Sequence, residues 1–127
     1  AYGIPGTRSV DEVVREVYDN HLRIAQLCGR PPQYFRAGTA HYDDAAVAIV
    51  GDLGETVAGF SVNADNGAQS AASTVRWNVG AAVPGDIVLA HMNQPGGGTA
   101  PGLLAGVDDQ LARGTRFVHL PKRSAAV

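Results

Sequence analysis

The sequence predicts an α/β fold with parallel strands, and two observations support this. Short apolar runs alternate along the chain with longer segments of helical periodicity. Connections of helical length between strands favour parallel strands joined by right-handed crossovers. The 127 residues, 45% of them hydrophobic, are enough for the core of one domain. The pattern by itself fits either half of a barrel or a small open sheet.

The first predicted element is a helix from about Val10 to Cys28. Ser9 and Glu12 have the spacing of a capping box, in which each side chain bonds a backbone N–H of the first turn. Gly29 should end the helix, because glycine adopts the left-handed conformation that follows a helix. The stripe expected to be buried consists of Val10, Val13, Val14, Val17, Ile24 and Leu27.

The middle of the chain predicts two strands and two helices. The elements expected are a strand at about Gln33–Ala37, a helix capped by Asp43 and Asp44 that ends near Asp52 before Gly54, a strand at Thr56–Val62, a loop at Asn63–Gln69, and a helix from Ser70 or Ser73 to about Val79. Each helix has a polar residue at its start that can accept an N–H bond.

The last part of the chain predicts a strand, a helix, a second strand and a tail. The strand Ile87–Met92 is nearly all apolar, as expected of a strand that is buried on both faces. Thr99 should cap a helix that runs to Arg113, with Gly114 at its end. Its apolar face is expected to be Leu103, Leu104, Val107 and Leu111. A last strand at Arg116–Leu120 and a frayed tail, Pro121–Val127, complete the chain.

Composition excludes several classes of function. The formal net charge is -2, the basic residues are scattered, and Lys122 is the only lysine, which argues against binding to nucleic acid or an anionic membrane through bulk charge. The single cysteine, Cys28, excludes an internal disulfide and is expected to be a buried, unreactive thiol. The longest apolar run, Ala45–Val50, is too short to span a bilayer.

Polar side chains stand where three of the predicted strands end. Arg36 ends the first strand, Asp65 follows the second, and His91 lies at the end of the third. Since parallel strands present their carboxyl ends at one edge, these three should converge there. His91 is the best candidate for a catalytic residue, because a histidine can protonate a leaving group near neutral pH. Asp65 could orient its ring and favour its charged form.

Each of these residues also has a purely structural interpretation. His91 could bond a loop carbonyl, Asp65 could cap a turn, and Arg36 could be a surface side chain. The remaining candidates are assigned structural roles. The histidines His21, His41 and His119 are expected at the surface or in packing, Trp77 is expected in the core rather than in a sugar site, and the loop Gly96-Gly97-Gly98-Thr99 is expected to be a turn and helix cap rather than a phosphate cradle.

The set of strand ends resembles the NodB-homology polysaccharide deacetylases, carbohydrate esterase family four. Phe35-Arg36-Ala37-Gly38-Thr39-Ala40 is similar to that family's third motif, F-R-x-P-Y-G. Val62-Asn63-Ala64-Asp65-Asn66 stands where its fourth motif, D-x-x-D-W, is expected, although it lacks the Trp and has the Asp one place early. Leu89-Ala90-His91 matches the fifth motif, L-x-H, and the segment 112–118 looks like the family's closing helix and strand.

The resemblance implies hydrolysis of N- or O-acetyl groups on a glycan with a divalent metal, usually zinc. It implies that His91 is the general acid, that Asp65 tunes it, and that Arg36 orients a catalytic carboxylate. Leu89 would line the pocket for the acetyl methyl group. The substrate-binding residues expected at these strand ends are Leu89, Asn63, Met92 and Asn93.

The family's first two motifs, T-F-D-D and H-[ST]-x-x-H, carry its base and metal ligands, and neither occurs in this sequence. The resemblance therefore implies that residues 1–120 are the C-terminal part of a deacetylase domain, the last part of a distorted (β/α) barrel, with 121–127 as a tail. No metal ligand is expected in this chain. An N-terminal segment of the same protein should complete the barrel and the metal site, and the chain alone should be inactive. The family also implies a secreted or cell-envelope protein.

Two other functions fit the sequence. A carbohydrate-binding relative that has lost its chemistry would explain the altered fourth motif. A small nucleotide- or phosphate-binding α/β domain would use the loop of three glycines, Gly96 to Gly98.

Overall fold

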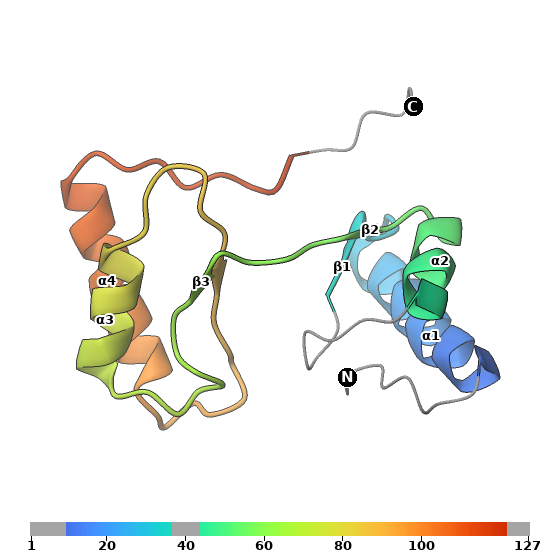
Figure 1. Ribbon diagram of the computed structural model, residues 1–127, viewed down its shortest axis with the longest axis horizontal. Helices are drawn as coiled ribbons and strands as arrows, with labels where there is room; N and C mark the ends of the chain where they lie inside the picture. The colour runs from blue at the N-terminus through green and yellow to red at the C-terminus, as the bar shows by residue number, and fades with distance from the viewer. Residues whose placement is uncertain (1–9, 37–43, 122–127) are drawn as a thin grey trace. The chain divides into compact units, whose positions relative to one another are not determined.

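The computed structural model describes residues 10–36 and 44–121, which divide into two units (Figure 1). The first unit comprises residues 1–59 and 121–127, and the second comprises residues 60–120. Within the described residues, each unit contains two helices and one two-stranded parallel sheet. The prediction of parallel strands is therefore confirmed for both pairs.

The first unit packs two helices against its strand pair. Its elements are α1 (Val10–Cys28), β1 (Tyr34–Phe35), α2 (Asp44–Asp52) and β2 (Thr56–Val57). β1 and β2 pair in parallel, with Tyr34 opposite Thr56 and Phe35 opposite Val57. The core consists of Val13, Val17, Ala46 and Val50, with Phe35, Ile49, Leu53 and Val57 packed around it.

Glycines end both helices of this unit as the sequence predicts. Gly29 has φ +75° and Gly54 has φ +81°, a region that only glycine enters without a steric cost. The proposed cap of α1, Ser9, lies outside the described residues, as does Asp43. Two expectations for α1 are wrong. Val14 and Leu27 are exposed rather than buried, and the Cys28 thiol is exposed at the end of the helix.

The second unit also alternates strands and helices, but it begins with a strand where the described part of the first unit begins with a helix. Its elements are β3 (Val62–Asn63), α3 (Ala72–Gly80), β4 (Val88–Leu89) and α4 (Thr99–Ala112). β3 and β4 pair in parallel, with Val62 opposite Val88 and Asn63 opposite Leu89. The core consists of Ala64, Val75 and Val79, with Val88, Ala90, Leu103 and Val107 packed around it.

α3 and α4 lie side by side because α4 presents glycines to α3 (Figure 1). A Cβ atom at Gly102 would lie 2.5 Å from the Ala72 carbonyl oxygen, and one at Gly106 would lie 2.7 Å from the Val79 Cβ. Contacts this short forbid any side chain, so the two backbones approach closely. The expected apolar face of α4 is therefore only half right, because Leu103 and Val107 pack inward while Leu104 and Leu111 are exposed.

Two predicted strands differ in the structure. The segment Thr56–Val62 is not one strand, because its hydrogen-bond partner changes along its length. The Ala58 amide donates to the Phe35 carbonyl, whereas the Ser61 amide donates to the Ile87 carbonyl. The predicted strand Arg116–Leu120 is not formed. Phe117 and Val118 are exposed there, so their apolar character does not reflect burial in a sheet.

The predicted N-caps of α3 and α4 are also wrong. The N-cap of α3 is Ala71 rather than Ser70 or Ser73, and that of α4 is Gly98 rather than Thr99. Neither N-cap makes a side-chain hydrogen bond. Thr99 instead uses its hydroxyl in the site described below.

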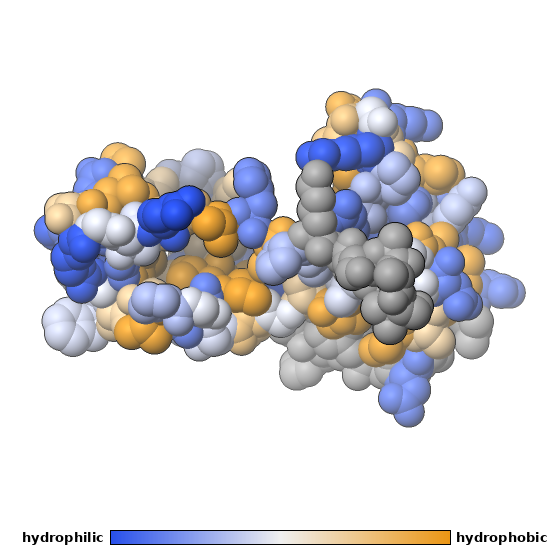
Figure 2. All heavy atoms as spheres, turned by 90° about the horizontal axis from the view of Figure 1, so that it is seen from above, coloured by the Kyte–Doolittle hydropathy of each residue, from blue (hydrophilic) through white to orange (hydrophobic). Residues whose placement is uncertain are grey.

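Large apolar side chains remain exposed in the second unit. They are Phe60, Trp77, Val83, Ile87, Met92, Leu104, Leu111, Phe117, Val118 and Leu120. Figure 2 shows hydrophobic side chains at the surface among the polar ones. The expectation that Ile87–Met92 is buried on both faces is wrong, since only Val88–Leu89 is a strand and Met92 is 96% exposed.

Candidate functional site

The loop after β3 wraps around Asp65. The Asn63 side-chain oxygen accepts from the Asn66 amide at 3.1 Å, and the Asp65 carbonyl accepts from the amides of Gln69 and Ser70 at 3.0 Å. Three consecutive residues, 66–68, have positive φ values of 48°, 68° and 69°. Asparagine and glycine adopt this conformation readily, whereas alanine does so at a cost. The buried Ala68 is thus held in an unfavourable conformation by the loop that fixes Asp65.

Asp65 contacts three hydrogen-bond donors from two other segments. Its Oδ1 lies 2.8 Å from His91 Nδ1, and its Oδ2 accepts from the His91 backbone N–H at 2.7 Å and from the Thr99 hydroxyl at 2.9 Å. The Asp65 side chain has no exposed surface. The carboxylate therefore joins the end of β3, the end of β4 and the first residue of α4.

Electrostatics keep Asp65 ionised at neutral pH. Burial by itself raises the pKa of its carboxyl, but the hydrogen bonds from the His91 ring, the His91 amide and the Thr99 hydroxyl outweigh burial, so the net pKa lies below its ordinary value. Its position at the N-terminus of α4 also favours a negative charge.

An ionised carboxylate can only accept hydrogen bonds, so His91 Nδ1 carries the proton that it donates to Asp65. The other ring nitrogen, Nε2, has no hydrogen-bond partner within residues 10–36 and 44–121. The His91 side chain is 25% exposed. The ring is thus oriented by one nitrogen and leaves the other available to accept or donate a proton.

The other predicted site residues of the second unit surround this pair along the chain. Leu89 is partly buried in β4, opposite Asn63 of β3, and Asn63 uses its side-chain oxygen to shape the loop. Met92 and Asn93 follow His91 and are exposed. The structural alternative for His91, a bond to a loop carbonyl, is not what this ring does.

Arg36 lies in the other unit, where it follows β1 and is exposed. Its convergence with Asp65 and His91 stays a prediction. Of the remaining histidines, His41 lies outside the described residues and His119 is exposed.

Sequence reasoning missed two contacts. The sequence predicts a helix cap at Thr99, yet the Thr99 hydroxyl donates to Asp65, and only the three-dimensional arrangement brings these residues together. His21 pairs with Glu55 in the first unit, with Nδ1 and Oε1 2.8 Å apart and both side chains largely buried. The signal in the sequence is an acidic residue, Glu55, directly before an apolar strand, and its burial becomes apparent only in the structure.

The described residues contain no group of three His, Cys, Asp or Glu side chains that could hold a metal ion. The described residues by themselves therefore do not form a site for the metal that the resemblance implies. No helix within the described ranges is long and apolar enough to cross a membrane.

Several solved chains resemble this one in structure, and two of them illustrate the likeness. One is a family 4 carbohydrate esterase from Streptomyces lividans in complex with acetate, with a TM-score of 0.71 and 16% identity over 84% of this chain and 55% of that one. The other is a mutant of BA3943, a CE4 family pseudoenzyme with restored enzymatic activity, with a TM-score of 0.68 and 18% identity over 84% of this chain and 37% of that one. No family model and no curated protein matches the sequence.

The fold of this chain is therefore similar to part of the fold of family 4 carbohydrate esterases. The chain spans about half of the length of the first structure and less of the second.

Proposed function

We propose that this chain is part of a metal-dependent hydrolase that removes acetyl groups from an N- or O-acetylated glycan. The observation that carries the proposal is the His91 ring, held by Asp65 at the carboxyl ends of two parallel strands. The likeness in fold to carbohydrate esterases supports the reaction class, and the acetate bound to one of them is the product that such a reaction releases.

In the proposed reaction, His91 acts as the general acid. The catalytic base takes a proton from water as the water oxygen adds to the acetyl carbonyl carbon. The bond from that carbon to the glycan nitrogen or oxygen then breaks, protonated Nε2 gives its proton to the leaving atom, and acetate is released. Asp65 would keep Nδ1 protonated and hold the imidazolium in place. Leu89 would contact the acetyl methyl group, while Asn63, Met92 and Asn93 would contact the glycan.

The rest of the proposed site would come from polypeptide outside this sequence. The divalent metal, with zinc as the proposed ion, and the catalytic base would be supplied by an N-terminal segment of the same protein, and Arg36 would orient that base. The exposed apolar side chains Phe117 and Val118, which lie outside the helices of the second unit, support a further segment that covers them. The family likeness also leads us to propose a secreted or cell-envelope location.

Acetate release from N-acetylglucosamine oligomers tests the proposal. The assay compares the chain alone with the longest natural polypeptide that contains it, each supplied with zinc. Release by the longer polypeptide and none by the chain alone is the expected result. A longer polypeptide that binds zinc but releases no acetate from N- or O-acetylated glycans would contradict it.

The second candidate is a non-catalytic carbohydrate-binding relative. The departure of Asn63-Ala64-Asp65-Asn66 from the fourth motif favours it, and one of the similar structures belongs to a pseudoenzyme whose mutant regained activity. Glycan binding by the longer polypeptide without acetate release would support this candidate over the hydrolase.

A further inference from the structure

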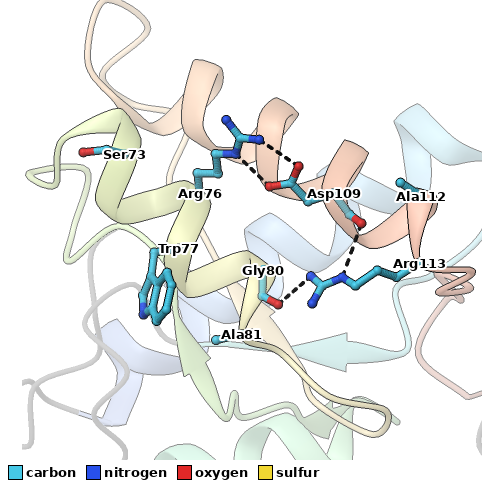
Figure 3. A pocket seen from close by; sticks show the side chains of 8 residues that line it. All are labelled: Ser73, Arg76, Trp77, Gly80, Ala81, Asp109, Ala112 and Arg113. Atoms are coloured by element: carbon cyan, nitrogen blue, oxygen red, sulfur yellow. Dashed lines mark hydrogen bonds and ion pairs between the residues drawn. The ribbon is translucent and has the colours of Figure 1, made fainter.

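A groove of about 650 Å³ lies on the α3–α4 face of the second unit, apart from the Asp65–His91 pair (Figure 3). Its lining includes Trp77 and Arg76 of α3, Gly80 at the end of α3, and Asp109 and Arg113 at the end of α4. A volume of this size is in the range of small-molecule sites. Figure 3 shows the Trp77 indole and the Arg113 guanidinium on either side of Gly80.

Trp77 is the unexpected member of this groove. The sequence predicts that Trp77 lies in the core, but the structure leaves it 75% exposed, because Val75 and Val79 occupy the buried face of α3. An indole presents a broad flat apolar surface, and leaving it in water forgoes the free energy that its burial would contribute. An exposed tryptophan inside a groove therefore indicates a surface that a ligand can cover.

The two arginines in the groove are fixed by hydrogen bonds. Arg76 donates to both carboxylate oxygens of Asp109, at 2.7 and 2.9 Å, and Arg113 donates to the Gly80 carbonyl at 2.6 Å. A guanidinium carries five N–H donors, so both groups retain donors for a ligand. Because these side chains are already ordered, a ligand that bonds them loses little side-chain entropy.

The groove is also built on a rigid base. Its walls are the two helices that pack through Gly102 and Gly106 with no room for a Cβ atom. The relative positions of Trp77 and Asp109 are therefore fixed by backbone packing rather than by a loop, as a preformed site requires.

We propose that this groove binds a pyranose unit of a glycan, with one face of the sugar stacked on Trp77 and its hydroxyls bonded to Arg76, Arg113 and Asp109. The choice of a glycan rests on the proposed function, and the groove would act as an anchoring site for the polymer away from the reacting acetyl group.

The chemistry of the lining favours a sugar over other ligands. The axial C–H groups of a pyranose form an apolar face that matches an indole, while its hydroxyls both donate and accept hydrogen bonds. A phosphate would be repelled by the negative charge of the Asp109 carboxylate. The hydrogen bond from Arg76 stabilises that charge and so lowers the pKa of Asp109. A purely apolar ligand would cover the arginine donors without bonding them.

Trp77 is the only tryptophan in the chain, so its fluorescence reports on this groove directly. The 127-residue chain is titrated with tetramers of N-acetylglucosamine and of xylose, and separately with acetate. A saturable blue shift with at least one tetramer, and none with acetate, is expected. The absence of any saturable change with both tetramers overturns the proposal.

Amide chemical shifts locate the bound sugar and allow variants to be compared. Shifts should cluster at residues 73–81 and 109–113, and Trp77→Ala should abolish binding while Trp77→Phe retains part of it. Arg113→Ala should weaken binding about threefold to tenfold, as expected for the loss of one hydrogen bond. Shifts confined to the surroundings of His91 would overturn the proposal.

A kinetic test separates this proposal from the proposed function. In the longer polypeptide, Trp77→Ala should raise KM for an acetylated polymer but leave turnover of a small acetylated monosaccharide unchanged. Sugar binding at Trp77 without acetate release would overturn only the hydrolase assignment. Acetate release with an unchanged KM for the polymer in Trp77→Ala would overturn only the anchoring site.

Discussion

Asp65 holds His91 at two points: Oδ1 lies 2.8 Å from the ring Nδ1 and Oδ2 lies 2.7 Å from the backbone nitrogen. The backbone contact continues the parallel ladder of β3 and β4, in which the Ala64 amide donates to the Leu89 carbonyl. Beyond the last backbone hydrogen bond of this ladder, the next one is therefore accepted by a side-chain carboxylate, that of Asp65. One residue fixes both the position of the strand end and the orientation of the imidazole.

The depressed pKa of Asp65 links stability to pH. Because the folded pKa lies below the ordinary value of 3.8, the ionised carboxylate stabilises the fold fully above that value and loses this effect as the pH falls through the folded pKa. The free energy of unfolding, followed by Trp77 fluorescence in urea, should therefore fall as the pH is lowered below about 4. Asp65→Asn should weaken this dependence.

Asp108→Asn is the matched control, since Asp108 is an exposed acid on α4 and its replacement should leave the acid-induced loss in place. An identical pH dependence in wild type and Asp65→Asn would show that the carboxylate does not carry the linkage.

Thr99 supplies the third donor to Asp65. Thr99→Val keeps the shape but removes the hydroxyl, which leaves a buried carboxylate oxygen with one bond fewer and should cost about 1–3 kcal/mol of unfolding free energy. Thr99→Ser keeps the hydroxyl and should recover most of that loss. Equal stabilities of the Val and Ser variants in urea titrations would rule out the hydrogen bond as the cause.

The close packing of α3 and α4 should be sensitive to a single methyl group. Gly102→Ala places a Cβ 2.5 Å from the Ala72 carbonyl oxygen and should destabilise the second unit by about 1–3 kcal/mol through overpacking. Gly51→Ala in α2 meets nothing within 4 Å and should stabilise its helix by roughly 0.5–1 kcal/mol. Thermal melts of both variants test this, and a stabilising effect of Gly102→Ala would contradict the contact.

The sequence predicted the helices and the central pair of the site better than the rest. Gly29 and Gly54 mark helix ends because only a residue without a side chain adopts their φ at no cost. The proximity of Asp65 and His91 could be predicted from the sequence, because neighbouring parallel strands of a sheet end at the same edge.

Other features depend on packing that no local pattern encodes. Hydrophobic periodicity predicted a leucine face for α4, but the contact with α3 is made by glycines, whose role lies in the absence of a side chain. Trp77 is apolar and was therefore placed in the core, yet two valines of the same helix fill the core side. The predicted strand Arg116–Leu120 does not form, because an apolar run forms a strand only where a partner strand is available.

The replacement of His91 by glutamine tests the central claim most directly. In the longest natural polypeptide that contains this chain, His91→Gln should lower turnover of an acetylated glycan by about 100-fold or more, since general acid catalysis contributes that much, while bound metal stays unchanged. His119→Gln, at an exposed histidine of the same unit, should turn over substrate like the wild type. Undiminished turnover in His91→Gln would contradict the account.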